Sequence, residues 1–224
     1  AGVMCRIWTA WALWRQGHTD EARTLADEAL ALGLSHSSAH VRAEAWMYAT
    51  AFYRSSGELD LCAESCEEFM ALADEFGFPA FRAVGEVVEG WLRACRGEAA
   101  GVDRVRAGID AWRATGSRVV APPLLGMLAE GCLAAERTDE GLAAVAEAIE
   151  FSVETGAMHY ACELYRLRAE LLLQRGDADH GAFLDGRMGH DGLLHLGREN
   201  IEAAGQDHVF LAVDEIIKIV VIAI

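Results

Sequence analysis

The fold of this chain is decided by residues 46–62, which read WMYATAFYRSSGELDLC. Alanine and aromatic residues recur at helical spacing up to Tyr53, a polar turn follows at Gly57 and Glu58, and a second periodic segment starts at Leu59. Apolar residues spaced three and four apart indicate amphipathic helices. Because the intervening turn is short, the two helices are expected to run antiparallel as a hairpin.

The same turn recurs along the chain. Each copy is a polar segment followed by a small residue, and the small residues stand at Ala22, Cys62, Gly101, Gly141 and Gly181, in steps of 40, 39, 40 and 40. Such a fixed period is typical of helical-repeat proteins, in which stacked hairpins bury a core that one hairpin cannot bury alone. We expect the small residue to let the two helices of each hairpin approach closely.

A second recurring feature is a glycine at the end of the second helix of each pair. It occurs at Gly33, Gly77, Gly116 and Gly156, in steps of 44, 39 and 40. Glycine adopts the left-handed backbone conformation at little cost, so each of these residues is a predicted helix C-cap.

These patterns predict an all-α fold, an α-solenoid of antiparallel helix pairs with about five repeats of roughly 40 residues. The predicted domain covers residues 1–180. Residues 181–224 are predicted to be an atypical glycine-rich tail with an apolar C-terminal segment, and a degenerate last repeat is the alternative interpretation of this tail. The predicted helices cover residues 3–15 with 19–32, 37–54 with 58–76, 79–95 with 99–115, 118–135 with 138–155, and 157–175 with a weaker partner after 178.

Residues 46–62 are similar to the tetratricopeptide repeat (TPR). The positions where that motif places Trp, Leu, a small residue, Tyr, a turn Gly and Ala are occupied by Trp46, Ala49, Thr50, Tyr53, Gly57 and Cys62. The resemblance implies a right-handed solenoid. The period of about 40 residues exceeds the 34 of the standard motif, so longer helices are expected.

Two further strings, WRATG at 112–116 and ELYRLRAELLL at 163–173, resemble the helical-repeat region of large bacterial signalling proteins. In that group a nucleotide cyclase or a DNA-binding domain precedes a STAND-type ATPase, which is followed by such an array. The resemblance covers about residues 2–180. It implies a regulatory scaffold that binds a protein, a peptide or neighbouring domains of the same polypeptide.

TPR-like arrays bind partners along the face formed by the first helix of each pair. Mixed charge with Trp and Arg suits protein recognition. Trp11 and Trp14 have an alternative reading as core residues, because aromatic residues at helical spacing usually pack inside. Carried onto this chain, the pattern gives the candidates Trp11, Trp14, Glu44, Arg54, Glu86, Arg93, Glu130, Glu163, Arg166 and Glu170.

The charge and the cysteines narrow the class of partner and the compartment. The chain has 19 basic and 35 acidic residues, a net charge of −16. This charge disfavours binding to nucleic acid, which needs Lys and Arg on the phosphates, and to anionic membranes. None of the six cysteines forms a Cys-x-x-Cys pair or a disulfide-like framework. We therefore expect a reducing, cytoplasmic location.

No motif for chemistry is visible, so the chain is expected to be no enzyme and to need no cofactor. It has neither a phosphate-binding loop nor a Gly-x-Ser-x-Gly elbow. Cys62 and Cys66 lie four apart and are expected to be core residues rather than metal ligands. The histidines and aspartates of the tail are also not expected to be metal ligands, but solvated turn residues. They are His180, Asp185, His190, Asp191, His195 and His208.

Two alternatives to a protein-binding scaffold remain. A small-molecule sensor on the same array predicts an enclosed pocket of a few hundred cubic ångströms with convergent polar groups. Self-association through uncapped terminal repeats is the other.

In the tail, residues 216–224 are rich in isoleucine, and we expect them to pack as a final helix or strand against the last repeat.

Overall fold

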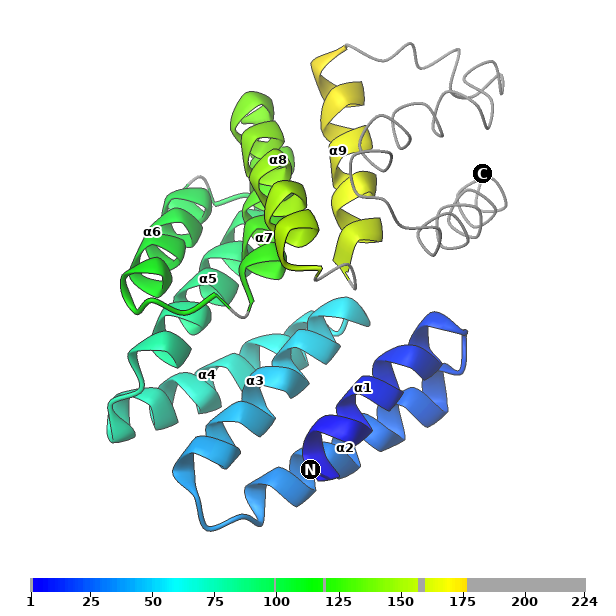
Figure 1. Ribbon diagram of the computed structural model, residues 1–224, viewed down its shortest axis with the longest axis vertical. Helices are drawn as coiled ribbons and strands as arrows, with labels where there is room; N and C mark the ends of the chain where they lie inside the picture. The colour runs from blue at the N-terminus through cyan, green and yellow to red at the C-terminus, as the bar shows by residue number, and fades with distance from the viewer. Residues whose placement is uncertain (1, 99, 119, 157–159, 177–224) are drawn as a thin grey trace. The chain divides into compact units, whose positions relative to one another are not determined.

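A computed structural model describes residues 2–98, 100–118, 120–156 and 160–176 (Figure 1). These ranges form an all-helical structure, which confirms the predicted class. The chain divides into two compact units, residues 1–119 and 120–224. The helices in the described ranges are α1 (Gly2–Arg15), α2 (Thr19–Leu34), α3 (Ala39–Ser55), α4 (Leu59–Phe76), α5 (Pro79–Cys95) and α6 (Ala100–Ala114) in the first unit, and α7 (Ala121–Ala134), α8 (Thr138–Thr155) and α9 (Ala161–Arg175) in the second.

Successive helices pack as hairpins. In the first unit α1 packs on α2, α3 on α4 and α5 on α6, while α2 also contacts α3 and α4 contacts α5. In the second unit α7 packs on α8, and α9 contacts both. Each described pair is therefore joined to the next one within its unit, as expected of a helical repeat.

The turn within each hairpin has the same backbone geometry. In the first three hairpins, a glycine at φ near +80° ends the first helix. In all four hairpins, the residue that follows this position donates its N–H to a carbonyl five residues earlier. This is the Schellman arrangement, which satisfies carbonyls left over at the helix end. The bonds run from His18 to Leu13 (3.0 Å), Glu58 to Tyr53 (2.9 Å), Glu98 to Arg93 (3.0 Å) and Arg137 to Cys132 (2.8 Å).

The fourth hairpin turn departs from this rule at one residue. Glu136 stands where the other turns have glycine, and its φ is +57°. An L-residue with a side chain is disfavoured in this left-handed conformation because its Cβ crowds the backbone. The α7–α8 turn therefore keeps the geometry of the others at an energetic cost.

The small residues of the repeat lie in the contact between helices, as the sequence predicts. Ala22 and Cys62 have no exposed surface, and Gly101 and Gly141 are buried. At Gly101 an added Cβ would lie 2.4 Å from the backbone nitrogen of Ala94. The fifth predicted small residue, Gly181, lies outside the described residues.

The closest approach is between α5 and α6. A Cβ added at Gly90 would lie 2.7 Å from the backbone nitrogen of Val105, and one added at Gly108 would lie 2.9 Å from that of Val87. At Gly90, Gly101 and Gly108 the backbone of one helix therefore approaches the backbone of the other directly, with the side chains of Val87 and Val105 beside the glycines.

Three of the four predicted glycine C-caps are confirmed and one is wrong. Gly77, Gly116 and Gly156 end α4, α6 and α8 with φ of +69°, +75° and +70°. Gly33 instead lies inside α2, because its lack of a side chain is needed for packing: a Cβ there would lie 2.2 Å from the Cβ of Ala45. This different role explains why its step to the next glycine is 44 residues.

The helix boundaries follow the predictions closely. Two helices start later than predicted: α7 from Ala121 instead of residue 118, and α9 from Ala161 instead of residue 157. In α7, Pro122 and Pro123 lie in the first turn, where proline is tolerated. Among the described residues no helix is both long and apolar enough to cross a membrane. The predicted helix after residue 178, the tail 181–224 and its candidate metal ligands lie outside the described residues.

The α5–α6 seam predicts that a single methyl group is costly at Gly101. Gly101→Ala places a Cβ against backbone atoms that cannot move aside, and overpacking of this kind costs about 1–3 kcal/mol of unfolding free energy. Gly85→Ala is the matched control, because there the nearest atoms belong to the flexible Met70 side chain. Urea denaturation should show a clear loss for Gly101→Ala and a change within about 1 kcal/mol for Gly85→Ala. Equal losses for both would contradict the seam.

The left-handed conformation of Glu136 predicts that glycine is the better residue there. Glu136→Gly removes a strain of about 1–2 kcal/mol, partly offset by the greater freedom of glycine in the unfolded chain. We expect a net stabilisation of about 0.5–1 kcal/mol in the urea midpoint. The control Ala143→Gly, at an exposed position inside α8, should destabilise by about the same amount. A lower midpoint for Glu136→Gly would show that its side chain contributes more than its backbone costs.

Candidate functional site

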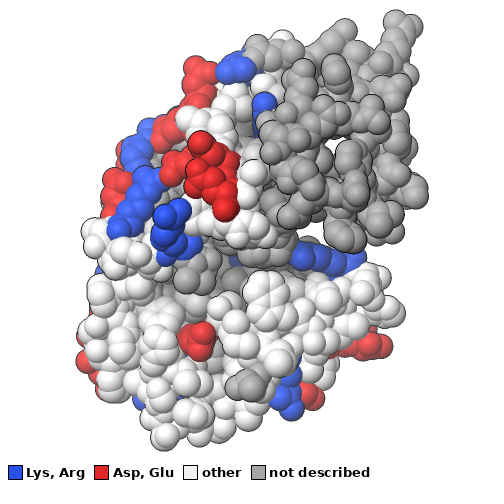
Figure 2. Space-filling model, in the orientation of Figure 1, with Lys and Arg blue, Asp and Glu red and all other residues white. Residues whose placement is uncertain are grey.

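The first helices of the hairpins form a layer in the first unit. Helix α3 contacts both α1 and α5, and the second helices contact the first helices on either side of them. We call the α1–α3–α5 side the first-helix layer. Figure 2 shows that the surface over α1 and α3 is mostly uncharged, with a small acidic spot over α3.

All ten candidate residues lie on first helices or on α9, and none is fully buried. Six lie in the first unit and four in the second. Arg93 and Arg166 are exposed, and the other eight are half-buried. By helix they are Trp11 and Trp14 on α1, Glu44 and Arg54 on α3, Glu86 and Arg93 on α5, Glu130 on α7, and Glu163, Arg166 and Glu170 on α9.

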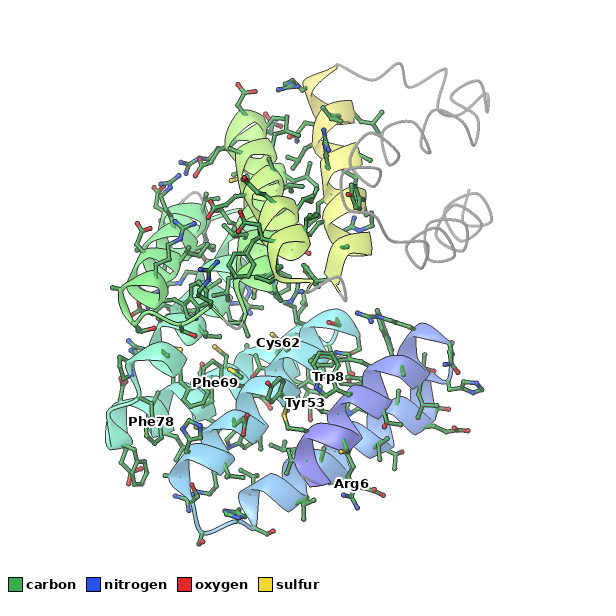
Figure 3. The ribbon with its side chains drawn as sticks, in the orientation of Figure 1. Arg6, Trp8, Tyr53, Cys62, Phe69 and Phe78 are labelled. Atoms are coloured by element: carbon green, nitrogen blue, oxygen red, sulfur yellow. The ribbon has the colours of Figure 1, made fainter. Side chains whose placement is uncertain are left out.

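An aromatic cluster joins α1 to α3. The ring of Trp11 meets Trp8 edge to face, with centroids 5.0 Å apart, and meets Tyr48 at 6.3 Å. Trp8 is 41% exposed, and Figure 3 shows it on the side of α1 that faces α3. Burial and the carboxylate of Glu44 raise the pKa of Tyr48. The cluster therefore combines large apolar area, open to solvent at Trp8, with a neighbouring negative charge.

Arginines and carboxylates continue this layer onto α5. The guanidinium of Arg54 lies 5.4 Å from the ring centroid of Trp91, a cation–π geometry that links α3 to α5. Glu86 lies 3.5 Å from Arg82 on its own helix. Glu89 accepts from Arg93 at 2.7 Å and from Arg104 of α6 at 3.0 Å, so Arg93 is held in a three-residue ion-pair network.

In the second unit the three α9 candidates form one group. Arg166 donates to Glu163 at 2.9 Å and to Glu170 at 2.6 Å. The hydrogen bond to Glu163, together with both negative charges, raises the pKa of Arg166. These side chains pair with one another, and the two carboxylates outnumber the one guanidinium, so the group as a whole stays acidic. Glu130 lies on α7 and is not among the partners of Arg166.

Trp8, Tyr48 and Glu89 are site residues that the sequence analysis missed. Trp8 lies three residues before Trp11, and Tyr48 four residues after Glu44. Residues at these spacings share one face of a helix. The spacing was therefore sufficient to find both once Trp11 and Glu44 had been singled out.

The buried thiols are not placed for chemistry. Cys62 and Cys66 are 0% and 3% exposed, and burial raises the pKa of each to about 12. The Cys66 thiol lies 3.6 Å from the Gly85 carbonyl oxygen. Within the described ranges no group of three or more His, Cys, Asp or Glu side chains could hold a metal ion. Both thiols thus behave as small core residues.

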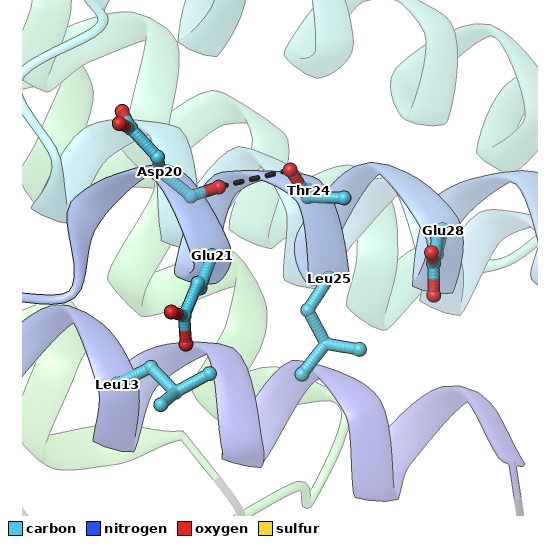
Figure 4. Close-up of a pocket in the computed structure, with 6 residues that line it drawn as sticks. All are labelled: Leu13, Asp20, Glu21, Thr24, Leu25 and Glu28. Carbon is cyan, nitrogen blue, oxygen red and sulfur yellow. Dashed lines mark hydrogen bonds between the residues drawn. The ribbon is translucent and has the colours of Figure 1, made fainter.

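A groove of about 390 Å³ lies between α1 and α2 (Figure 4). Its apolar residues are Leu13 and Leu25, and its polar residues are Asp20, Glu21, Thr24 and Glu28. The Thr24 hydroxyl donates to the Asp20 carbonyl at 2.9 Å, so it is occupied within the helix. The groove is open along one side and lacks the enclosure that a small-molecule sensor needs.

Comparisons with protein-family models, with curated proteins and with solved structures find no match for this chain. Its function is therefore inferred from the described side chains: an exposed aromatic cluster on α1 and α3, paired charges on α5 and α9, and an acidic groove beside α2.

The raised thiol pKa values predict a loss of stability at alkaline pH. Folding favours the protonated thiols, so their contribution is complete below the unfolded pKa of about 9 and is lost as pH rises toward 12. Each thiol adds up to about 1.4 kcal/mol per pH unit to this slope. The unfolding free energy from urea titrations at about pH 8, 9 and 10 should fall less steeply for Cys62→Ala than for the wild type. Cys5→Ala, at an exposed position, should leave the slope unchanged; a slope insensitive to Cys62→Ala would refute the assignment.

Proposed function

We propose that this chain is a non-catalytic, TPR-like scaffold whose first-helix layer binds a protein or peptide segment. The proposal includes a right-handed solenoid of about five repeats in the cytoplasm, as part of a larger bacterial signalling or transcription-regulating ATPase of the STAND type. The repeated hairpin turns and the buried small residues support the TPR-like part.

The observation that carries the proposal is the aromatic cluster of Trp8, Trp11 and Tyr48. A large aromatic side chain left 41% exposed has apolar area that is not used for folding. Trp, Tyr and Arg are the residues that most often supply binding energy at protein interfaces. Here the three types lie on neighbouring helices, with Arg54 beside Trp91 one helix further along the layer.

The chemistry of the layer defines the partner. Apolar side chains fit against the tryptophans, and a basic group suits the carboxylate of Glu44 next to Tyr48. A segment that follows the layer across α1, α3 and α5 would meet these features in turn. We therefore expect a peptide with apolar anchors and a nearby Lys or Arg.

The test is selection of a displayed peptide library on the wild-type chain, followed by affinity measurements with variants. Trp8→Ala should weaken the selected peptide by about tenfold or more, because loss of an aromatic anchor costs more than 1.4 kcal/mol. Phe76→Ala is the matched control, since Phe76 is 43% exposed but lies at the end of α4 away from the cluster.

Circular dichroism should show both variants folded, because each of the two side chains is more than 40% exposed. Selected peptides whose affinity is unchanged by Trp8→Ala, or is lost equally with Phe76→Ala, would refute binding at this layer. Glu44→Lys adds an independent readout: it should weaken peptides that carry Lys or Arg and spare neutral ones.

A further inference from the structure

A second aromatic cluster lies between α3 and α5, and we call it the α3–α5 cluster. The ring centroid of His40 lies 5.1 Å from that of Phe81 and 5.5 Å from that of Phe78, and the two phenylalanines meet edge to face at 5.8 Å. His40 is exposed, and both phenylalanines are half-buried. Figure 3 shows Phe78 and Trp8 on opposite sides of α3. The first-helix layer therefore has an aromatic cluster on each side of α3.

Within the α3–α5 cluster, His40 and Phe81 are the residues that belong to first helices. Phe76 is on α4, a second helix, and its ring contacts the cluster through Phe78, with centroids 6.1 Å apart. The guanidinium of Arg42 lies 5.9 Å from the centre of the Phe76 ring. A ligand that lies along the layer thus meets His40 and Phe81, and Phe76 stands outside its path.

One face of α3 connects the two clusters. His40, Glu44 and Tyr48 are spaced four apart, and residues at this spacing share a helix face. Tyr48 contacts Trp11 at one end of this face, and His40 contacts Phe81 at the other. Because an α-helix rises about 1.5 Å per residue, the two ends lie about 12 Å apart, with Glu44 midway. The face thus has aromatic rings at both ends and a carboxylate between them.

Glu44 gives this face its charge. Its side chain is half-buried, and within the described part of the chain it pairs with no Lys or Arg. The nearest arginine along α3, Arg42, lies two residues away, and residues two apart do not share a helix face. The carboxylate is therefore available to a basic group of a ligand, and this complementarity selects ligands that carry one.

We propose that the first-helix layer binds an extended segment of a separate protein in which residues i and i+4 are large and apolar and residue i+2 is Lys or Arg. One apolar anchor lies on the cluster of Trp8, Trp11 and Tyr48, the other lies on the α3–α5 cluster, and the basic residue pairs with Glu44. An extended chain advances about 3.3 Å per residue, so residues four apart are separated by about 13 Å, and residues i, i+2 and i+4 point to the same side. The inference rests on the proposed function and adds the conformation, spacing and charge of the partner.

The rings favour an extended segment over a helix. Trp11 contacts Tyr48 across the gap between α1 and α3, and His40 contacts Phe81 across the gap between α3 and α5. A helix with its side chains is about 10–12 Å wide and binds in a groove of matching width. Because the rings bridge both gaps, neither gap forms such a groove at the clusters. An extended segment needs only a line of contacts for alternate side chains.

The described part of the chain does not supply this segment. There the pattern of two large apolar residues around Arg or Lys occurs only at Met4–Trp8, which lies inside α1 and is helical. Beyond the described residues it occurs at Ile216–Val220, with Lys218 in the middle. The proposed occupant is a segment of another protein, and the variant Lys218→Glu distinguishes it from residues 216–220.

The test compares synthetic peptides by fluorescence anisotropy with the full chain. The first peptide has nine residues, with Leu at positions 3 and 7, Arg at position 5 and Ser elsewhere. A second peptide moves the later Leu to position 6, which turns it to the opposite side of an extended chain, and a third has Glu in place of Arg. We expect the first peptide to bind about tenfold tighter than either of the others.

A fourth peptide tests the helical alternative. It is rich in Ala, with Leu at positions 3 and 11 and Arg at position 7, which is the spacing of the same anchors on a helix. We expect it to bind more weakly than the first peptide. Tighter binding of this peptide would overturn the extended conformation.

Variants assign the anchors. Phe81→Ala should weaken the first peptide by about tenfold, but by less than about twofold when one of its leucines is already Ala; Trp8→Ala should behave in the same way with the other leucine. Phe76→Ala is the matched control and should change the affinity by less than about twofold. Phe81 is half-buried, so circular dichroism checks its variant, and His40→Ala, at an exposed position, should weaken the same anchor.

A charge exchange tests the role of Glu44. Glu44→Lys should weaken the Arg peptide and strengthen the Glu peptide, each by about tenfold, because the attraction and the repulsion exchange places. Glu67→Lys makes the same charge change at an exposed position of α4 and should change either affinity by less than about twofold. Equal effects of the two variants would indicate general charge attraction and overturn the pairing with Glu44.

The outcomes separate this inference from the proposed function. Equal affinities of the first two peptides, or no binding of the first while library-selected peptides bind and depend on Trp8, would overturn the inference alone. Insensitivity of every bound peptide to Trp8→Ala would contradict the proposed function. Lys218→Glu should leave the affinity of the first peptide unchanged. Tighter binding to this variant would show that residues 216–220, of the same or a second copy, compete for the layer, and would overturn the separate partner.

Discussion

The structure depends on close contact between the two helices of each hairpin, which between α5 and α6 becomes a direct approach of the two backbones. At the start of the second helix stands Ala22, Cys62, Gly101 or Gly141, and each is buried against the first helix or its neighbour. A larger side chain there would separate the helices and leave voids along the whole contact, where dense packing provides most of the stability of a helical pair. The turn serves the same constraint, since its left-handed residue sets the direction from which the second helix returns.

Because the constraint acts at fixed spacing, much of the fold could be predicted from the sequence. The 40-residue period, the hairpin turns and most helix ends follow from the positions of glycine and small residues. Gly33 shows the limit: glycine serves both as a helix end and as a point of close contact, and only the neighbour Ala45 distinguishes the two. Glu136 shows the opposite case, because it adopts the left-handed conformation although nothing in the sequence marks it as a turn residue. The contact between α7 and α8 determines the turn, and the turn imposes this conformation on Glu136.

The candidate site was less predictable, for a physical reason. Periodicity identifies which face of a helix is apolar, but exposure depends on what the neighbouring helices cover. The sequence therefore placed Trp11 and Trp14 on a helix but could not decide whether they belong to the core or to the surface. In the structure both side chains are half-buried. Ion pairs between different helices, such as that of Glu89 of α5 with Arg104 of α6, also cannot be predicted from helical spacing. Ion pairs along one helix can be, and Glu163, Arg166 and Glu170 pair at the expected spacings of three and four residues.

A repeat also separates the surfaces that are used for folding from those that remain for binding. In the first unit α2 and α4 each have two roles, because α2 closes its own hairpin and covers α3, and α4 does the same for α5. The covering face of one hairpin must therefore match the covered face of the next, which fixes the small residues on both.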